Sequence, residues 1–337
     1  MPVQDLAERV RAGDRRALAR AVTLVESARP DHRAAAEALF AALPPAGRPA
    51  LRLGVSGAPG VGKSTFIDAF GRLAIGRGHR LAVLAVDPSS RLSGGSILGD
   101  KTRMAELARE AAAFIRPSPS GEGRGGVARR TGEAILLCEA AGYDLIIVET
   151  VGIGQSETAV ADLVDMVVLL LQPGAGDELQ GVKRGVVELA DLILVTKADG
   201  EFAAAADRAA AEYGNALGLL RPRSPYWRPE ILAVSALAGA KLAEAWQAVE
   251  RFRAAMTESG ALAARRAEQA RAALWAELAA TLIDRLRASA ALAAQLPEIE
   301  AAVAAGRLPP ALAARRLVAA MLGAEPAPPD ATAPGAA

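Results

Sequence analysis

Residues 57–65 read Gly57-Ala58-Pro59-Gly60-Val61-Gly62-Lys63-Ser64-Thr65, and this stretch decides the fold of the 337-residue chain. It fits the phosphate-loop pattern G-x-x-x-x-G-K-[ST]. The apolar run at 51–55 predicts a short strand before the loop, and residues 64–73 predict a helix after it. A strand, a glycine-rich loop and a helix in this order are the setting in which such loops bind nucleotides. The sequence therefore predicts an α/β fold of the P-loop NTPase type, with a mainly parallel sheet flanked by helices.

The chemistry of the loop follows from its geometry. Glycines allow consecutive backbone N–H groups to turn toward one phosphate, and the N-terminus of the following helix adds the positive end of a dipole. The Lys63 ammonium can reach the β- and γ-phosphates, and the Ser64 hydroxyl can bind Mg²⁺. The alternative, a glycine-rich turn without a ligand, is disfavoured by the lysine and by the flanking strand and helix. The loop alone distinguishes neither ATP from GTP nor a kinase from a switch protein.

Composition limits the class of protein. Hydrophobic residues make up 52% of the chain, much of it alanine, which predicts a helix-rich α/β protein with a sizeable core. The net charge of +1 gives no electrostatic argument for nucleic acid or an anionic membrane as a partner. The one cysteine, Cys138, cannot form an intrachain disulfide, and we expect it to be a buried structural thiol. Neither a signal peptide nor a membrane-spanning run is apparent, so we expect a cytoplasmic protein.

Changes in composition divide the chain into four parts. The first predicts a helical cap on the core, with one helix between Leu6 and Val22 and a second from about residue 31 to 43. The second is the P-loop domain, the third is helical, and the fourth is an alanine- and proline-rich tail that we expect to be disordered. These parts are residues 1–47, 48–255, 256–322 and 323–337.

Short apolar runs predict the strands of the sheet. Between the second and third runs, residues 115–126 predict an irregular loop, and a helix is expected at about 127–141. The runs are nearly continuous in apolar residues, as is typical of parallel strands that are buried on both faces. The six predicted strands lie at 51–55, 81–86, 145–148, 166–171, 192–195 and 231–234.

Acidic residues follow two of these strands. Asp87 ends the second strand and Glu149 the third, so both carboxylates can reach Mg²⁺ or its water shell at the edge where the phosphate loop lies. Asp100, in the glycine-rich segment after Asp87, is a further candidate ligand. The amide of Gly152 can bond the γ-phosphate and lose that bond after hydrolysis. The sequence thus predicts a Mg²⁺ site made of Ser64, Asp87, Asp100 and Glu149, with Lys63 and Gly152 on the phosphates.

The ends of the last two strands predict a guanine site. The fifth strand runs into Thr196-Lys197-Ala198-Asp199, which fits [NT]-K-x-D. The Asp199 carboxylate can accept from N1–H and from the 2-amino group of guanine, whereas adenine offers neither donor there. The Lys197 stem can pack over the base plane. The sixth strand runs into Ser235-Ala236-Leu237, where a backbone N–H can bond the guanine O6 atom.

Several long runs carry a resemblance to a known family. The motif Glu149-Thr150-Val151-Gly152, led by glutamate instead of aspartate, resembles the P-loop GTPases that include the metallochaperones. Within that group, the chain is similar to the methylmalonyl-CoA mutase-associated GTPases, also labelled ArgK type, over most of residues 10 to 285. It departs from the family pattern at 91–93 and 122–124, which lie outside the nucleotide motifs. The similar runs are 15–27, 86–90, 94–104, 116–120 and 173–181.

The resemblance implies a GTP-driven chaperone of an adenosylcobalamin-dependent acyl-CoA mutase, which gates cofactor loading and protects or reactivates the mutase. It implies Mg²⁺ and GTP or GDP as ligands, but no tightly bound organic cofactor, because adenosylcobalamin belongs to the mutase. It also implies that the loop from Gly174 to Arg184 is an additional switch toward the client. Finally, it implies a homodimer joined through the C-terminal helices. The apolar stripe at Leu274, Leu278 and Leu282 suits such a dimerisation arm, although packing on the protein's own core is the alternative.

Two other function classes stay open. A P-loop ATPase or kinase, as the ArgK label suggests, is disfavoured by Asp199. A metallochaperone GTPase needs clusters of cysteine and histidine. Since only Cys138, His32 and His79 are present and they lie far apart in the sequence, that role is disfavoured too.

Overall fold

The structure is a computed structural model that describes residues 2–27, 29–44, 47, 49–87, 104–119, 124–150, 157–173, 184–218 and 222–322. The predicted site residues Asp100 and Gly152 lie outside these ranges, as do residues 174–183 of the expected switch loop and the tail. The chain forms two compact units, Met1–Ala270 and Arg271–Ala337.

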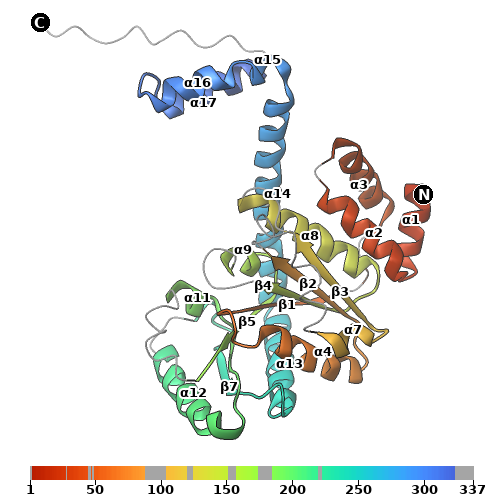
Figure 1. Cartoon of the computed structure of the whole chain (residues 1–337), viewed down its shortest axis with the longest axis vertical. Helices are drawn as coiled ribbons and strands as arrows, with labels where there is room; N and C mark the ends of the chain where they lie inside the picture. The colour runs from red at the N-terminus through yellow and green to blue at the C-terminus, as the bar shows by residue number, and fades with distance from the viewer. Residues whose placement is uncertain are drawn as a thin grey trace, which may run out of the picture. The chain divides into compact units, whose positions relative to one another are not determined.

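Seven strands form one sheet in the order β3-β2-β4-β1-β5-β6-β7 (Figure 1). All neighbouring strands are parallel, and β1 lies between β4 and β5. The carboxyl ends of the strands therefore share one edge, where α/β sheets bind their ligands. The predicted α/β fold with a parallel sheet is confirmed. The strands are β1 (Leu51–Gly57), β2 (Leu81–Asp87), β3 (Ala113–Pro119), β4 (Leu145–Thr150), β5 (Met166–Leu171), β6 (Leu192–Val195) and β7 (Glu230–Ala233).

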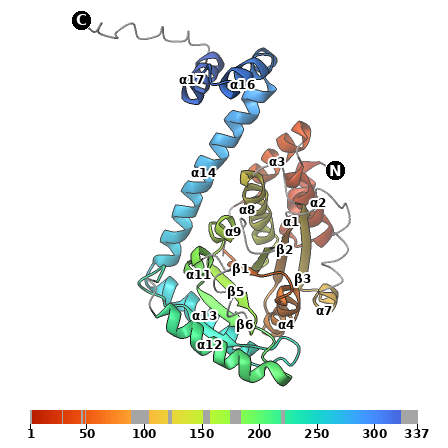
Figure 2. The ribbon, with the colours of Figure 1, turned by 60° about the vertical axis from the view of Figure 1, so that its left-hand side comes forward.

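Helices of the unit Met1–Ala270 flank the sheet (Figures 1 and 2), and helices contribute most of the remaining described residues of the chain. In chain order they are α1 (Val3–Arg11), α2 (Arg15–Glu26), α3 (Pro30–Ala42), α4 (Lys63–Gly76), α7 (Ala105–Arg109), α8 (Arg124–Ala140), α9 (Glu157–Ala161), α11 (Arg184–Leu189), the 3₁₀ helix η1 (Gly200–Phe202), α12 (Ala203–Leu217), α13 (Leu242–Glu258), α14 (Ala261–Ala288), α15 (Ala290–Ala293), α16 (Leu296–Ala304) and α17 (Pro310–Met321).

The sheet separates two buried clusters. On one face, α4 and α13 pack on the strands, and the rings of Phe70 and Trp246 lie 5.6 Å apart between centroids. On the other face, α8 contributes Leu137 to a cluster that also contains the N-terminal helices. Consecutive residues of β4 alternate between the clusters, with Ile147 in the first and Val148 in the second. A side chain's position along a strand therefore decides on which face of the sheet it lies and which helices it contacts.

The edge strand β3 corrects one prediction. The sequence predicts an irregular loop over residues 115–126, but Ala113–Pro119 form a strand that pairs with β2 throughout. The sequence does not predict this strand, because it contains Pro117 and Pro119 and proline is more typical of loops. An edge strand tolerates proline, since one of its sides has no ladder bonds to make. α8 then begins at Arg124, three residues earlier than the expected start.

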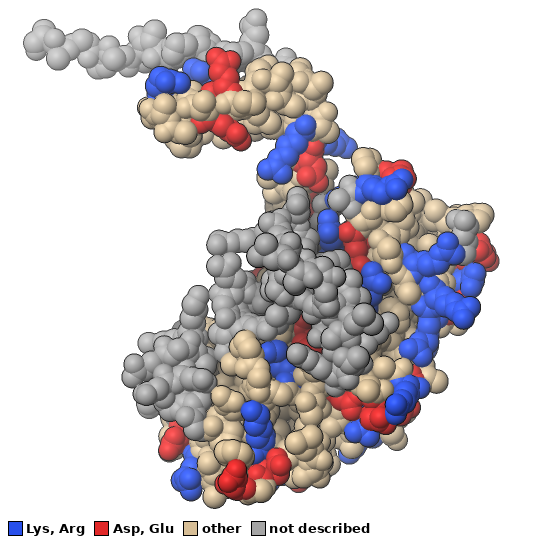
Figure 3. Space-filling model, in the orientation of Figure 1, with Lys and Arg blue, Asp and Glu red and all other residues tan. Residues whose placement is uncertain are grey.

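The N-terminal cap also differs in detail. Where the sequence predicts one helix between Leu6 and Val22, the chain forms α1 and α2. It turns at Gly13, whose φ is +76°, and Asp14 caps α2 by accepting from the amides of Arg16 (2.8 Å) and Ala17 (3.1 Å). α2 packs on α8, as expected of a helical cap. Arginines gather on the exposed surface of α1 and α2 (Figure 3).

Buried ion pairs fix the start of α14 to the amino edge of the sheet, which the sequence does not predict. Arg266 donates to Asp165 (Nε to Oδ1, 2.7 Å) and to the carbonyl of Ala50 (Nη2 to O, 2.6 Å). Arg265 pairs with Asp191 (Nη1 to Oδ2, 3.3 Å). The side chains of Asp191 and Asp165 are 2% and 0% exposed, and burial raises the pKa of Asp191. These aspartates directly precede β6 and β5, so α14 is held at the strand starts.

Further along α14, the predicted apolar stripe is present and exposed. Trp275, for example, is 68% exposed. The dimerisation arm and packing on the protein's own core both stay predictions, because the stripe belongs to the unit Arg271–Ala337. No helix in the described part of the chain combines the length and the apolar character that a membrane crossing requires. The exposed side chains of the stripe are Leu274, Trp275, Leu278, Leu282 and Ile283.

Candidate functional site

The phosphate loop connects β1 to α4 in a conformation that requires glycine. Gly60 and Gly62 have φ angles of +79° and +98°, in the left-handed region. At Gly57, a Cβ atom would lie 2.6 Å from the carbonyl oxygen of Leu170, a distance that real Cβ atoms essentially never show. α4 begins at Lys63 without a side-chain cap and without an acidic residue in its first turn. This helix end is therefore suited to bind an anion.

Lys63 is the buried cation of the loop. Its Nζ atom donates to the carbonyl oxygens of Gly57 (2.7 Å) and Ala58 (3.1 Å). The residue is only 8% exposed, although it carries a charge. The loop's own carbonyls thus fold the lysine stem over the loop. They hold the ammonium where the β- and γ-phosphates of a nucleotide would lie.

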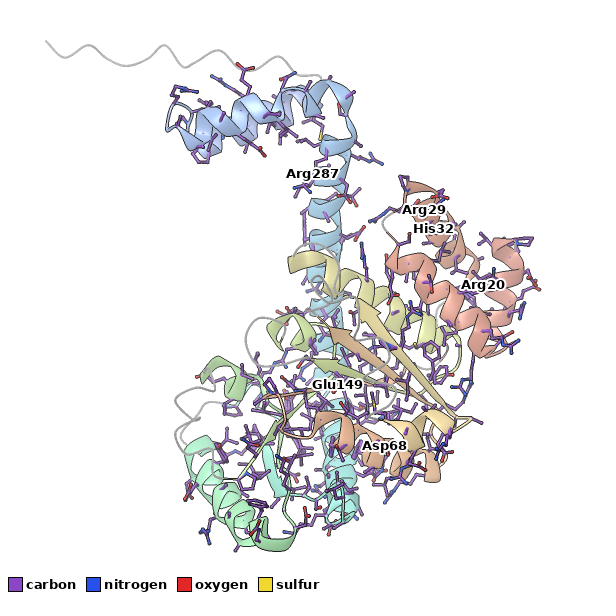
Figure 4. All side chains as sticks on the ribbon, in the orientation of Figure 1. Arg20, Arg29, His32, Asp68, Glu149 and Arg287 are labelled. Atoms are coloured by element: carbon purple, nitrogen blue, oxygen red, sulfur yellow. The ribbon has the colours of Figure 1, made fainter. Side chains whose placement is uncertain are left out.

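The hydroxyl of Ser64 and the carboxylate of Glu149 meet at the carboxyl edge of the sheet. Ser64 Oγ donates to Glu149 Oε1 at 3.0 Å, from the start of α4 to the end of β4. Figure 4 labels Glu149 at this place. A hydroxyl and a buried carboxylate side by side are oxygen ligands of the kind that Mg²⁺ prefers, so the pair fits this ion. Asp87 ends β2, the neighbour of β4, so its backbone lies at the same edge.

The residues predicted to recognise the base lie at the ends of β6 and β7. Asp199 Oδ1 accepts from Ser235 Oγ at 2.6 Å, and Ser235 Oγ accepts from the amide of Ala238 at 3.1 Å. Ser235 is fully buried. Lys197 has a φ of +58°, and its Nζ atom lies 3.3 Å from Gln172 Oε1. The structure thus brings the predicted Asp199 and Ser235 together, and it fixes the carboxylate that would accept from guanine.

A buried hydroxyl connects the predicted base-recognition motif to the phosphate loop. Thr196 Oγ1 lies 2.7 Å from the carbonyl oxygen of Val61 and 3.1 Å from that of Leu171. The sequence identifies Thr196 only as the first residue of a motif. Its role in joining the two halves of the site depends on contacts across 135 residues, which no local pattern reveals. The available signal is a threonine at the end of a wholly apolar strand.

The remaining predicted residues take varied positions. Thr65 and Leu237 are exposed, whereas Cys138 is fully buried, and burial raises the pKa of its thiol. The expectation of a structural thiol is therefore confirmed. Within the described ranges, no three side chains among His, Cys, Asp and Glu form a group that could hold a metal ion.

The family of this chain follows from comparison with known proteins. Residues 18–291 match the family described as methylmalonyl Co-A mutase-associated GTPase MeaB. The chain belongs to this family. A member of the MeaB family with an intact P-loop fold is a GTPase, so the chain hydrolyses GTP, and the resemblance found in the sequence is confirmed.

Two relatives and one solved structure are similar to most of the chain. GTPase ArgK of Escherichia coli is 52% identical over 261 residues, covering 77% of this chain and 79% of that protein. The mouse protein named "methylmalonic aciduria type A homolog, mitochondrial" is 49% identical over 316 residues, covering 91% of this chain and 76% of its own. The crystal structure of an LAO/AO transport system kinase superposes with a TM-score of 0.73 at 40% identity, covering 95% and 97% of the two chains.

Proposed function

We propose that this MeaB-family GTPase is a chaperone of an adenosylcobalamin-dependent acyl-CoA mutase, with methylmalonyl-CoA mutase as its client. It gates loading of the cofactor and protects or reactivates the mutase. The observation that carries the proposal is the joined nucleotide site, in which Thr196 bonds the phosphate loop beside a fixed Asp199 carboxylate. The family description, which names the mutase, supports the choice of client.

Each part of the site has a role in this proposal. Backbone N–H groups of residues 57–65 bind the phosphates, and Lys63 offsets their charge. Asp199 and Lys197 read the guanine base, with the backbone of 235–237 at its O6 atom. Because Ser235 holds the Asp199 carboxylate, little reorganisation is needed when the base binds.

Mg²⁺ fits the oxygen ligands at the carboxyl edge. Ser64, Asp87, Asp100 and Glu149 are the residues that we propose to hold it. When bound, the ion neutralises charge on the phosphate oxygens. The protein's own contribution is to fix Ser64 and Glu149 beside each other, and to hold the Lys63 ammonium on the carbonyls of the phosphate loop. The amide of Gly152 then reports whether the γ-phosphate is present.

The contacts with other proteins belong to the same proposal. β5 ends at the carboxyl edge, and residues 174–184 come after it in the sequence, so we propose that they respond to the nucleotide and contact the mutase. The exposed apolar stripe of α14 supports a homodimer, since a soluble protein rarely leaves such a face uncovered. We place both assemblies in the cytoplasm.

The test is GTP hydrolysis by the purified protein with and without the purified acyl-CoA mutase of the same organism. We expect slow intrinsic turnover, a large increase with the mutase, and co-elution of the two proteins. Asp177→Ala and Lys183→Ala should keep basal turnover within about threefold and lose most of the stimulation. A mutase that neither binds nor changes turnover would contradict the chaperone role, and equal stimulation of both variants would contradict the role of the loop.

A further inference from the structure

The hydrogen-bond ladder between β1 and β4 stops where both strands enter the nucleotide site. The two strands pair from Leu51 opposite Leu145 up to Val55 opposite Glu149. One residue later, the ladder of β1 runs only to β5, and the ladder of β4 runs only to β2. Beyond Glu149, the ladder between β1 and β4 therefore no longer sets the distance between the phosphate loop and the end of β4, Glu149 and Thr150, which we call the third motif.

Two buried hydroxyls bridge β1 and β4 one residue beyond the last pair of their ladder. Thr150 Oγ1 donates to Ser56 Oγ at 3.1 Å, and the two residues are 0% and 2% exposed. Ser56 directly precedes Gly57, the first residue of the phosphate loop. Thr150 directly follows Glu149. The bond thus joins the start of the phosphate loop to the third motif.

The hydroxyl bridge and the Ser64–Glu149 bond lie on opposite faces of the sheet. Side chains alternate along a strand, so Thr150 points to the face of Val148, which packs with α8, while Glu149 points to the face of α4. Together, the two bonds hold the end of β4 from both sides. Each connects it to an element of the phosphate loop, β1 on one face and α4 on the other.

Stability alone does not explain the hydroxyl pair. A bonded pair of buried hydroxyls can be replaced by two apolar groups of similar shape at little cost. The preceding residues on the same face of β4, Ile146 and Val148, are fully buried and apolar. Apolar residues in place of Thr150 and Ser56 would therefore fit this buried face equally well. What the hydroxyls add is a directional bond with a defined length.

We propose that Thr150 and Ser56 are positioning residues for GTP hydrolysis, because their hydrogen bond fixes the third motif relative to the phosphate loop. The inference rests on the proposed function, which places Glu149 at the ion. Without the bond, Glu149 becomes the last residue at which β4 is joined to β1, so its carboxylate shifts relative to the phosphates. A displacement on the order of 1 Å can cost roughly 100-fold in rate. Binding of GDP, which lacks the γ-phosphate, should change little.

The experiment compares Thr150→Val, which removes the hydroxyl, with Thr150→Ser, which keeps it. We expect Thr150→Val to lower kcat roughly 10- to 100-fold, with the affinity for GDP within about twofold, and Thr150→Ser to restore most of the turnover. Ser56→Ala should have a similar effect, and the double variant Ser56→Ala/Thr150→Val should lose no more than either single one. Thr131→Val, at a buried threonine of α8, controls for the general cost of removing such a hydroxyl.

The outcomes separate this inference from the proposed function. Wild-type turnover in Thr150→Val, or losses that multiply in the double variant, would overturn the positioning role. A loss in Thr150→Val that matches its loss in thermal stability and is shared by Thr131→Val would overturn it too. Lys63→Ala is measured alongside. If that variant also turns over GTP normally, the proposed site is wrong; if it is inactive while Thr150→Val is normal, only the inference fails.

Discussion

The two edges of the sheet both carry polar side chains, but they differ in what those side chains bind. At the carboxyl edge, Lys63 bonds backbone carbonyls and Ser64 bonds Glu149, so short contacts surround the place of a nucleotide. At the amino edge, Arg266 pairs with Asp165 and Arg265 with Asp191, so the charges neutralise each other. The first edge is arranged for an outside ligand, and the second edge is complete without one.

This difference separates turnover from stability. A buried ion pair is weak evidence of stabilisation, but removing one partner leaves the other charge buried and is costly. Changes at the amino edge should therefore lower the free energy of unfolding and leave hydrolysis nearly unchanged. Changes at the carboxyl edge should slow hydrolysis and leave the free energy of unfolding nearly unchanged, because its side chains act on a ligand that the unfolded protein does not bind.

The largest effect is expected from Lys63→Ala. It removes the ammonium that the loop holds over the phosphates, so hydrolysis should fall by roughly 10³-fold. The midpoint of urea unfolding without nucleotide should change little, since the bonds of Lys63 to the carbonyls of Gly57 and Ala58 stay within the loop. Turnover at the wild-type rate would remove the phosphate loop from the reaction.

The next effect is expected from Arg266→Ala at the amino edge. It leaves Asp165, whose side chain is 0% exposed, without this partner. The free energy of unfolding should fall by about 3 kcal/mol, while kcat stays within about threefold. The matched control is Arg251→Ala, which breaks a bidentate pair with Glu230. The side chains of Arg251 and Glu230 are 53% and 30% exposed. Loss of this pair should therefore lower the free energy of unfolding by at most about 1 kcal/mol. Equal losses in the two variants would show that the amino edge is no special anchor.

The residues at the carboxyl edge can be predicted from the sequence much better than those at the amino edge. Each motif there follows an apolar strand, and the carboxyl ends of parallel strands meet, so Lys63, Glu149 and Asp199 could be placed together without coordinates. The fold class follows from the same runs. The roles of the residues between Val151 and Ser156 stay a prediction.

The amino edge could not be predicted, because its partners share no local pattern. Arg266 and Asp165 are 101 residues apart in the sequence. From the sequence alone, an arginine on a helix is expected to be exposed to solvent. The Thr150–Ser56 bond was hidden for the same reason, across 94 residues. β3 was missed because Pro117 and Pro119 argue against a strand, and only its place at the sheet edge permits them.

Competition for labelled GTP tests the central claim, a guanine-specific site at the carboxyl edge, most directly. Unlabelled GTP should displace the label from the wild-type protein, and ATP should not do so even in large excess. In Asp199→Asn, the lost acceptor should weaken GTP by roughly 1–3 kcal/mol and shift the preference to XTP, whose 2-position carries an oxygen. Displacement by ATP at equal concentration, or an unchanged order of GTP and XTP in Asp199→Asn, would contradict the account.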